Sequence, residues 1–112
     1  MILLISAQQP KLESPIDDRF GRSPWLIQVD TVTNNWEAFP NPGVNQSSGA
    51  GVAAAQFAID QHVNLVISGD FGPHAASAFK AAKIEMYLFS QDILTVQQAI
   101  DYFKQDKLPA FY

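Results

Sequence analysis

Two short apolar runs constrain the fold of this chain more than any other feature. Residues 2–6 (Ile-Leu-Leu-Ile-Ser) and residues 65–68 (Leu-Val-Ile-Ser) contain no charged side chain, and both are too short to be buried helices. Strands that are apolar on both faces are typical of the centre of a sheet that helices cover on both sides. The sequence therefore predicts an α/β fold built around these two strands.

Further strands and helices are predicted between and after these runs. Residues 25–30 and 35–39 favour β-structure and are separated by a short polar stretch, so we expect an antiparallel hairpin. An apolar helix ends near residue 61, with Ser47 or Ser48 as the expected cap. Its interior is apolar almost all round, which predicts deep packing against the sheet. The remaining predicted elements are a helix at about 74–82, a strand at 85–89 and a helix from Thr95 to about Gln105 that opens with a capping box.

The order β-β-β-α-β-α-β-α defines a topology. An initial meander followed by right-handed crossovers gives a five-stranded mixed sheet in the order 3-2-1-4-5, with helices on both faces. This is the ribonuclease-H-like three-layer arrangement. The chain has 112 residues, a common size for one domain, so we expect a single domain over residues 1–112.

The composition excludes several kinds of site. Cysteine is absent, which rules out disulfides, thiolate zinc sites and thiolate ligation of an iron-sulfur cluster. The net charge of -4 argues against general nucleic-acid binding, which needs clustered Lys and Arg. The apolar start lacks a basic n-region, and no apolar run approaches the ~20 residues of a membrane helix. We therefore expect a soluble, cytoplasmic protein that binds neither nucleic acid nor membrane.

The topology also predicts where a ligand binds. The parallel strands place their carboxyl ends at one edge of the sheet, which is where α/β proteins usually bind ligands. Two helix N-termini, near Gly49 and Gly72, point to the same edge and favour anions through their N–H groups and dipoles. The candidate cofactor-binding residues are Arg19, Phe20, Gly21, Arg22, Gly49, Gly51, Gly69 and Gly72, and the candidate metal ligand is His74.

Each candidate also has an interpretation that needs no ligand. The two arginines either clamp an anion or pair with nearby aspartates to order their loop. Asp17 and Asp18 are more typical of solvated turn charges than of metal ligands. His74 either ligates a metal through a neutral imidazole or is exposed in the first turn of its helix. The glycines either open towards an anion or allow close packing, and Phe20 either shields a cluster or anchors the core.

Four segments together resemble the dinitrogenase iron-molybdenum cofactor biosynthesis family. They are IDDRFGRSPW at residues 16–25, NPG at 41–43, GAGVAA at 49–54 and ISGDFGP at 67–73. The resemblance covers essentially the whole chain, and four motifs in the right order are more specific than any single glycine pattern. It implies a ribonuclease-H-like domain of the kind found in NifX-like carriers and at the end of the NifB enzyme.

The resemblance implies carriage and not catalysis. Such carriers hold iron-sulfur precursors or the finished iron-molybdenum cofactor, and an orange-protein-like carrier holds a molybdenum-copper sulfide cluster without covalent attachment. The expected function is therefore non-covalent binding of an anionic metal-sulfur cluster, with cofactor-assembly or nitrogenase-related proteins as partners. The chain departs from cysteine- or histidine-bearing relatives, since it has no cysteine and its histidines are His62 and His74.

Two other classes of function share either the predicted topology or the loop chemistry. A nuclease or hydrolase of ribonuclease-H-like topology needs carboxylates within the strands to hold two metal ions, but residues 2–5 are all apolar, which argues against it. A regulatory module that binds a small anion or a protein partner would use the same loop chemistry as a cluster carrier. The residues alone leave that alternative open.

Overall fold

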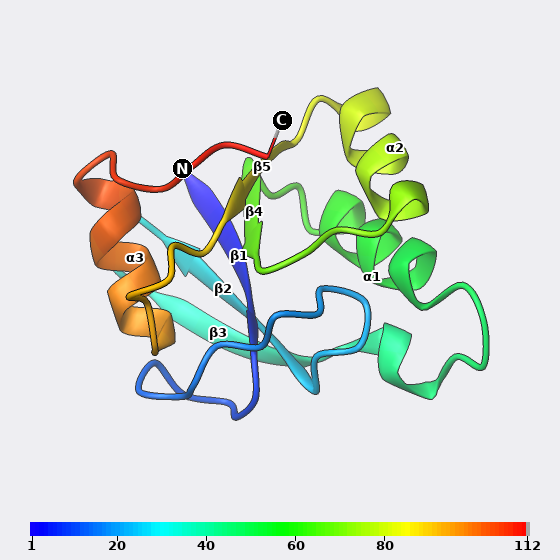
Figure 1. Ribbon diagram of the computed structural model, residues 1–112, viewed down its shortest axis with the longest axis horizontal. Helices are drawn as coiled ribbons and strands as arrows, with labels where there is room; N and C mark the ends of the chain where they lie inside the picture. Colours follow the sequence, from blue (N-terminus) through cyan, green and yellow to red (C-terminus); the bar gives the residue numbers. More distant parts are fainter. Residues whose placement is uncertain (112) are drawn as a thin grey trace.

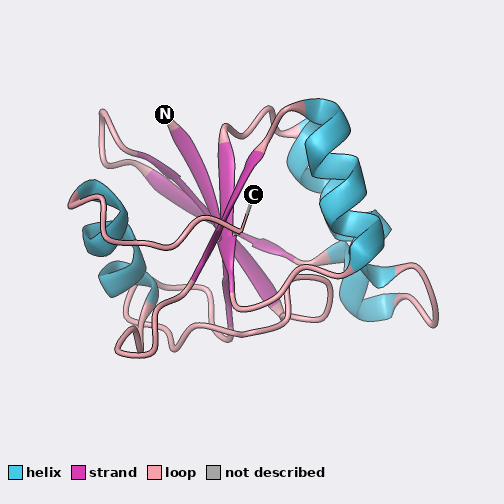
Figure 2. Ribbon diagram, turned by 45° about the horizontal axis from the view of Figure 1, so that its top comes forward, coloured by secondary structure: helices cyan, strands magenta, loops and turns pink. Residues whose placement is uncertain are grey.

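The computed structural model describes residues 1–111 and contains one five-stranded sheet with helices on both sides (Figures 1 and 2). None of the helices in this described part is both long and apolar enough to span a membrane. The strands are β1 (Ile2–Ala7), β2 (Trp25–Asp30), β3 (Trp36–Pro40), β4 (Leu65–Ser68) and β5 (Glu85–Leu88). The helices are α1 (Ala50–Asp60), α2 (Pro73–Ala82) and α3 (Val96–Lys104), with a short 3-10 helix, η1 (Pro42–Asn45).

The order of the strands is β3-β2-β1-β4-β5, as the sequence predicts. The central strand, β1, pairs antiparallel with β2 and parallel with β4, so that Leu3 has Val29 on one side and Leu65 on the other. β5 pairs parallel with β4. The α/β, ribonuclease-H-like fold class is therefore confirmed, and the carboxyl ends of β1, β4 and β5 share one edge, the lower one in Figure 1.

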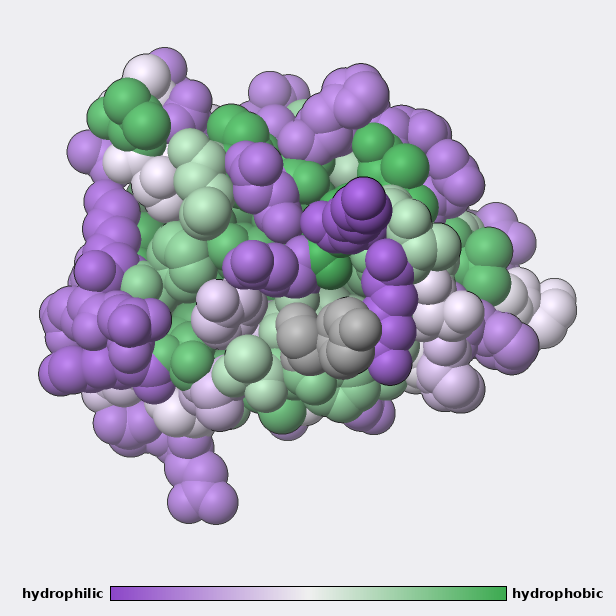
Figure 3. Space-filling model, turned by 90° about the horizontal axis from the view of Figure 1, so that it is seen from above, coloured by the Kyte–Doolittle hydropathy of each residue, from purple (hydrophilic) through white to green (hydrophobic). Residues whose placement is uncertain are grey.

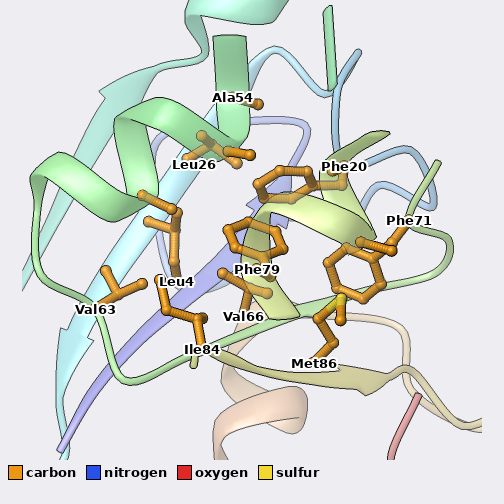
Figure 4. Close-up of a cluster of buried hydrophobic side chains, with 14 residues drawn as sticks. Leu4, Phe20, Leu26, Ala54, Val63, Val66, Phe71, Phe79, Ile84 and Met86 are labelled. Carbon is orange, nitrogen blue, oxygen red and sulfur yellow. The ribbon is translucent and has the colours of Figure 1, made fainter. Parts of the chain in front are cut away.

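One face of the sheet packs against α1 and α2 around a group of phenylalanines (Figure 4). The ring of Phe20 lies 5.3 Å from that of Phe79 and 5.5 Å from that of Phe71, between ring centroids. Phe20 comes from the loop after β1 and is only 2% exposed. Its burial removes a large apolar area from water, a stabilisation of about 2 kcal/mol, and so anchors that loop to the core.

The other face packs against α3, which behaves as its periodicity predicts. Val96, Ala99 and Ile100 are buried against the sheet. The predicted capping box is confirmed: the hydroxyl of Thr95 accepts a hydrogen bond from the backbone N–H of Gln98 (3.2 Å), and the Gln98 side chain accepts one from the N–H of Thr95 (3.1 Å). Two otherwise unpaired N–H groups of the helix start are satisfied in this way.

The start of α1 differs from the prediction. Its N-cap is Gly49, with a φ of 75°, and no side chain caps the helix, so the expected cap at Ser47 or Ser48 is wrong. A left-handed φ favours glycine because it has no Cβ to clash with the backbone. The expected deep packing is also wrong in part: Ala54 is fully buried, but Val52 is 49% exposed.

Buried polar groups tie the loop of residues 7–24 to the sheet. The hydroxyl of Ser6 lies 2.6 Å from the carbonyl oxygen of Asp17 and 2.8 Å from the hydroxyl of Ser68, and both serines are fully buried. Asp17 is itself 5% exposed, so its interpretation as a solvated charge is wrong, whereas Asp18 is exposed. The loop is therefore part of the packed structure.

The two outer strands of the sheet differ in how they are covered. The chain after α3 runs beside β5, where the N–H of Leu88 donates to the carbonyl of Pro109 and the N–H of Phe111 donates to that of Met86, both at 2.9 Å. The ring of Phe111 also packs on that of Phe71, 5.4 Å away. Within residues 1–111, no strand or bridge pairs with the outer side of β3.

Candidate functional site

A shallow depression of about 250 Å³ lies at the predicted edge of the sheet, between the loop of residues 7–24 and the starts of α1 and α2. It brings together three segments that are far apart in the sequence. Six of the eight candidate cofactor-binding residues line it. The lining residues are Arg19, Phe20, Gly21, Arg22, Ala50, Gly51, Asp70 and Gly72.

Arg19 is held by Asp17 but stays open to solvent. Its Nε lies 3.2 Å from Oδ1 of Asp17 and its Nη2 lies 3.2 Å from Oδ2, a two-point ion pair. The hydrogen bond to Asp17 and the charge of that carboxylate raise the pKa of Arg19 above its usual value. The Arg19 side chain is 66% exposed. The ion pair therefore orients the guanidinium while leaving other N–H groups available to a ligand.

A backbone carbonyl group positions the side chain of Arg22. Its Nη1 donates a 2.5 Å hydrogen bond to the carbonyl oxygen of Gln46, which lies in the segment before α1. Arg22 is exposed, as is Asp70, whose backbone pairs with that of Arg19. Of the side chains that line the depression, two are cations and one is an anion, and Asp17, which lies outside this lining, is paired with Arg19 and offsets part of its charge.

Two helices begin at the depression. Ala50 and Gly51 form the first turn of α1, and Gly72 is the N-cap of α2. The first N–H groups of a helix have no partner within the helix, and the helix dipole is positive at that end. Both features add to the attraction that the arginines exert on an anion.

Close packing of glycines fixes the shape of the depression. A Cβ added to Gly21 would lie 2.9 Å from the backbone nitrogen of Gly51, and one added to Gly43 would lie 2.2 Å from the carbonyl oxygen of Gly21. Neither position has room for a side chain, because the neighbouring atoms are backbone. The backbone of the loop thus lies directly against the start of α1.

Asn41 fixes the same region through its side chain, a role that was not predicted from the sequence. Its side-chain amide donates to the carbonyl oxygen of Phe20 (2.9 Å) and to the hydroxyl of Ser23 (3.1 Å), and its Oδ1 accepts from the N–H of Gly43. Asn41 is 2% exposed. The Asn-Pro-Gly motif predicts a turn, but only the structure shows that its first residue bridges the site loop and η1.

Three candidates lie outside this depression. Gly49 is the N-cap of α1, immediately before the lining residue Ala50 in the sequence. His74 is exposed in the first turn of α2. Gly69 lines a different and larger hollow of about 620 Å³, together with Asp18 and residues of the segment 89–94. The candidate cofactor-binding residues at this edge of the sheet are therefore divided between two hollows.

A metal cage of protein ligands is not formed. Among residues 1–111 there is no group of three or more His, Cys, Asp or Glu side chains placed to hold a metal ion. Figure 3 shows the molecule from above, where hydrophilic and hydrophobic residues are interspersed on the surface. The chemistry of the candidate site is thus that of hydrogen-bond donors and positive charge, gathered at the loop edge.

Comparison with known sequences points to one family. The model of the family described as dinitrogenase iron-molybdenum cofactor matches residues 1–106. An uncharacterized protein of Methanocaldococcus jannaschii is 27% identical over 119 aligned positions, which cover 99% of this chain and 99% of that protein.

Solved structures share the fold over nearly their whole length. The apo form of the orange protein from Desulfovibrio gigas superimposes with a TM-score of 0.90 at 32% identity, covering 97% of this chain and 91% of that one. A Thermotoga protein proposed to be a NifB protein superimposes with a TM-score of 0.83 at 28% identity, with the same coverage of 97% and 91%.

Proposed function

Because the chain belongs to the dinitrogenase iron-molybdenum cofactor family, we propose that it binds an anionic metal-sulfur cluster and carries it as cargo. The cluster is of the iron-molybdenum-sulfur or molybdenum-copper-sulfur type and is held without covalent attachment. The proposed site is the depression lined by Arg19, Arg22 and the starts of α1 and α2.

The observation that carries this proposal is the convergence of positive groups. Two guanidinium groups and two helix N-termini meet at one depression of an otherwise acidic protein. Bulky sulfide-bearing anions are weakly hydrated at their surface and suit many dispersed N–H donors better than one compact charge. At Gly72 no atom lies within 4 Å of the place where a Cβ would stand, so an anion can approach the backbone there closely.

The residues present fit a cluster that keeps its own ligands. The chain has no cysteine, and the described residues form no multidentate metal site. Attachment would therefore rest on charge and hydrogen bonds to the sulfides. His74, two residues after Gly72 in the first turn of α2, is the proposed source of one direct, exchangeable bond to metal. Weak attachment of this kind suits delivery to another protein of cofactor assembly.

The lining chemistry also supports a non-catalytic role. Asp70 is the one carboxylate in the lining, and the interior of β1 is apolar at Leu3, Leu4 and Ile5. Two-metal hydrolysis needs several carboxylates around paired metal ions. We therefore propose that the protein holds and hands over its cargo and performs no hydrolysis.

The test is an anaerobic titration of the apo-protein with tetrathiomolybdate, with and without copper or iron salts. Visible absorption and metal content per chain are measured after gel filtration. Arg19→Ala and Arg22→Ala should each weaken retention several-fold. Lys11→Ala is the matched control, because it removes a cation from the same loop but outside the lining of the depression.

The outcomes separate the alternatives. Coloured protein that both arginine variants lose and the Lys11 variant keeps supports the proposed site, and a further loss in His74→Ala supports direct ligation. Equal retention by all variants moves the site elsewhere. If no metal stays bound, carriage of thiomolybdate-type clusters is contradicted, and titration with sulfate and molybdate then tests the small-anion function.

A further inference from the structure

The outer side of β3 is the open edge of the sheet among residues 1–111. At the other end of the sheet, the chain's own residues 109–111 hydrogen-bond to β5 and cover it. Unpaired strand edges offer rows of N–H and C=O groups to other chains. The question is which partner this particular edge can accept.

The hydrogen-bond phase of the β2–β3 ladder determines which backbone groups face outward. The N–H of Asp30 donates to the carbonyl of Asn35 (2.9 Å), and the N–H of Asn41 donates to that of Pro24 (3.0 Å). In an antiparallel pair, hydrogen-bonded and non-bonded positions alternate. Odd-numbered residues of β3 therefore bond to β2, and the backbone groups of its even-numbered residues point outward.

The three outward-facing residues are Trp36, Ala38 and Pro40. The first two each offer an N–H and a C=O, whereas Pro40 offers a carbonyl but has no N–H. Proline and short length usually protect an edge by leaving a partner strand with unmatched groups. An acceptable partner must therefore place an acceptor opposite each available N–H, and its own carbonyl opposite the nitrogen of Pro40 must find a hydrogen bond elsewhere.

We infer that this edge pairs with the β3 strand of a second copy, antiparallel, with Ala38 on the two-fold axis. In this register the N–H of Ala38 meets the carbonyl of the other Ala38, and the N–H of Trp36 meets the carbonyl of the other Pro40. All four outward N–H groups of the two copies find an acceptor. The carbonyl of Trp36 lies opposite the nitrogen of the other Pro40, so in this register it receives no hydrogen bond from the partner strand.

The side chains favour the same register. On one face Trp36, which is 43% exposed, lies opposite the flat apolar ring of the other Pro40, and small Ala38 side chains meet at the axis. On the other face Glu37 lies opposite Phe39 of the second copy. Shifting the alignment to centre on Glu37 would keep four hydrogen bonds but place two glutamates directly opposite each other, which is unfavourable.

The first test is sedimentation equilibrium of the full chain over a range from micromolar to millimolar concentration. A reversible monomer–dimer equilibrium is expected. Ala38→Pro should return the protein to a monomer, because it removes an outward N–H while the ladder to β2 does not use that group. A far-UV circular dichroism spectrum like that of the parent protein establishes that the variant is folded. A monomer at every concentration for the parent chain would overturn the inference.

A cross-linking test addresses the geometry, and the absence of native cysteine makes it clean. Hydrogen-bonded antiparallel partners have Cα atoms about 5.5 Å apart, within the range of a disulfide. Ala38→Cys should therefore cross-link at least about tenfold faster than Val32→Cys, since pairing raises the effective thiol concentration. Val32 is the matched control, because it lies at the same end of the molecule and is 79% exposed. Equal rates would indicate random collision and contradict the pairing.

The register has its own test. Glu37→Lys chains mixed with parent chains should associate no more strongly than parent chains alone if residue 37 lies opposite Phe39. A several-fold gain on mixing would instead place residue 37 opposite itself and overturn the alignment centred on Ala38.

Discussion

Asp17 and Arg19 form a two-point ion pair in which the carboxylate is buried and the guanidinium is exposed. Oδ1 of Asp17 also accepts a hydrogen bond from the backbone N–H of Arg19, at 2.9 Å. One carboxylate therefore fixes both the turn of the loop and the direction of the cation at the depression. This arrangement combines the two interpretations of the arginine, because the pairing that orders the loop also presents its free N–H groups.

Replacement of Asp17 should destabilise the fold. Asp17→Ala removes the acceptor for the backbone N–H of Arg19 within a buried turn, and the expected loss of unfolding free energy is about 1 kcal/mol. Asp17→Asn, which keeps one acceptor oxygen, should lose less. Urea unfolding measures both. Asp18→Ala, at the exposed neighbouring position, should change stability by no more than about 0.5 kcal/mol; an equal loss there would contradict the role of the buried carboxylate.

The glycines around the depression should respond differently to alanine. Gly43→Ala forces a Cβ to within 2.2 Å of the carbonyl oxygen of Gly21, and should cost about 2 kcal/mol or more. Gly49→Ala meets no neighbouring atom but keeps a φ of 75°, and should cost about 1 kcal/mol. Gly72→Ala has open space and a φ of -62°, but alanine is a poorer N-cap than glycine, so the two effects should offset each other to within about 0.5 kcal/mol.

Thermal or urea unfolding of the three glycine variants provides the ranking. Gly72→Ala serves as the internal control, because the substitution is chemically the same. A similar cost at all three positions would show that unfolded-state effects dominate and that the close contact at Gly43 relaxes without penalty.

A pH-dependent contribution is expected from Tyr102 and Asp92. The phenol of Tyr102 donates a 2.5 Å hydrogen bond to Oδ2 of Asp92. This bond, followed by one from Ser90, lowers the pKa of Asp92 below its ordinary value of 3.8. The same bond, together with burial and the charge of Asp92, raises the pKa of Tyr102 above its ordinary value of 10.0.

The sign of each pKa shift sets the pH window. The Asp92 contribution is present above its unfolded pKa and is lost as the pH falls through the lowered folded pKa. The Tyr102 contribution is present below its unfolded pKa and is lost as the pH rises through the raised one. The stability difference between the parent protein and Tyr102→Phe should therefore be greatest at neutral pH and shrink towards both extremes. Urea unfolding across pH measures it, and Asp92→Asn should flatten the acid side.

The capping box of α3 should be measurable by single substitutions. Thr95→Ala removes the acceptor for the N–H of Gln98 and should cost about 1 kcal/mol. Gln97→Ala, an exposed position in the first turn of the same helix, should stay within about 0.5 kcal/mol. Guanidinium unfolding checks both, and a loss at residue 97 that matched the loss at 95 would show that the effect is not specific to the capping residue.

The structural features that the sequence predicts correctly are those that depend on local patterns. Apolar runs such as residues 65–68 are short and uninterrupted, so their strand character and central place follow without knowledge of distant contacts. The Thr95–Gln98 box is likewise local, because its four atoms lie within one turn of helix. The candidate site benefits from the same logic, since topology alone brings loop 7–24 to the starts of two helices.

Features that depend on contacts between distant segments escape such patterns. Asp17 is buried because the loop packs over Ser6 and Ser68, and no sequence spacing records that contact. The cap of α1 is Gly49, since the chain must turn through a left-handed residue there, although serines stand immediately before it. The side chain of Asn41 donates a hydrogen bond to the carbonyl oxygen of Phe20, 21 positions away. The Asn-Pro-Gly motif therefore indicates a turn but does not reveal this long-range contact.

The backbone contact between Gly21 and Gly51 has a consequence for protein engineering. Main-chain packing sets the outline of the depression. A combinatorial library can therefore vary the exposed side chains of Arg19, Arg22 and Asp70 while the backbone around them stays the same. Such a library would change the charge of the depression through three codons.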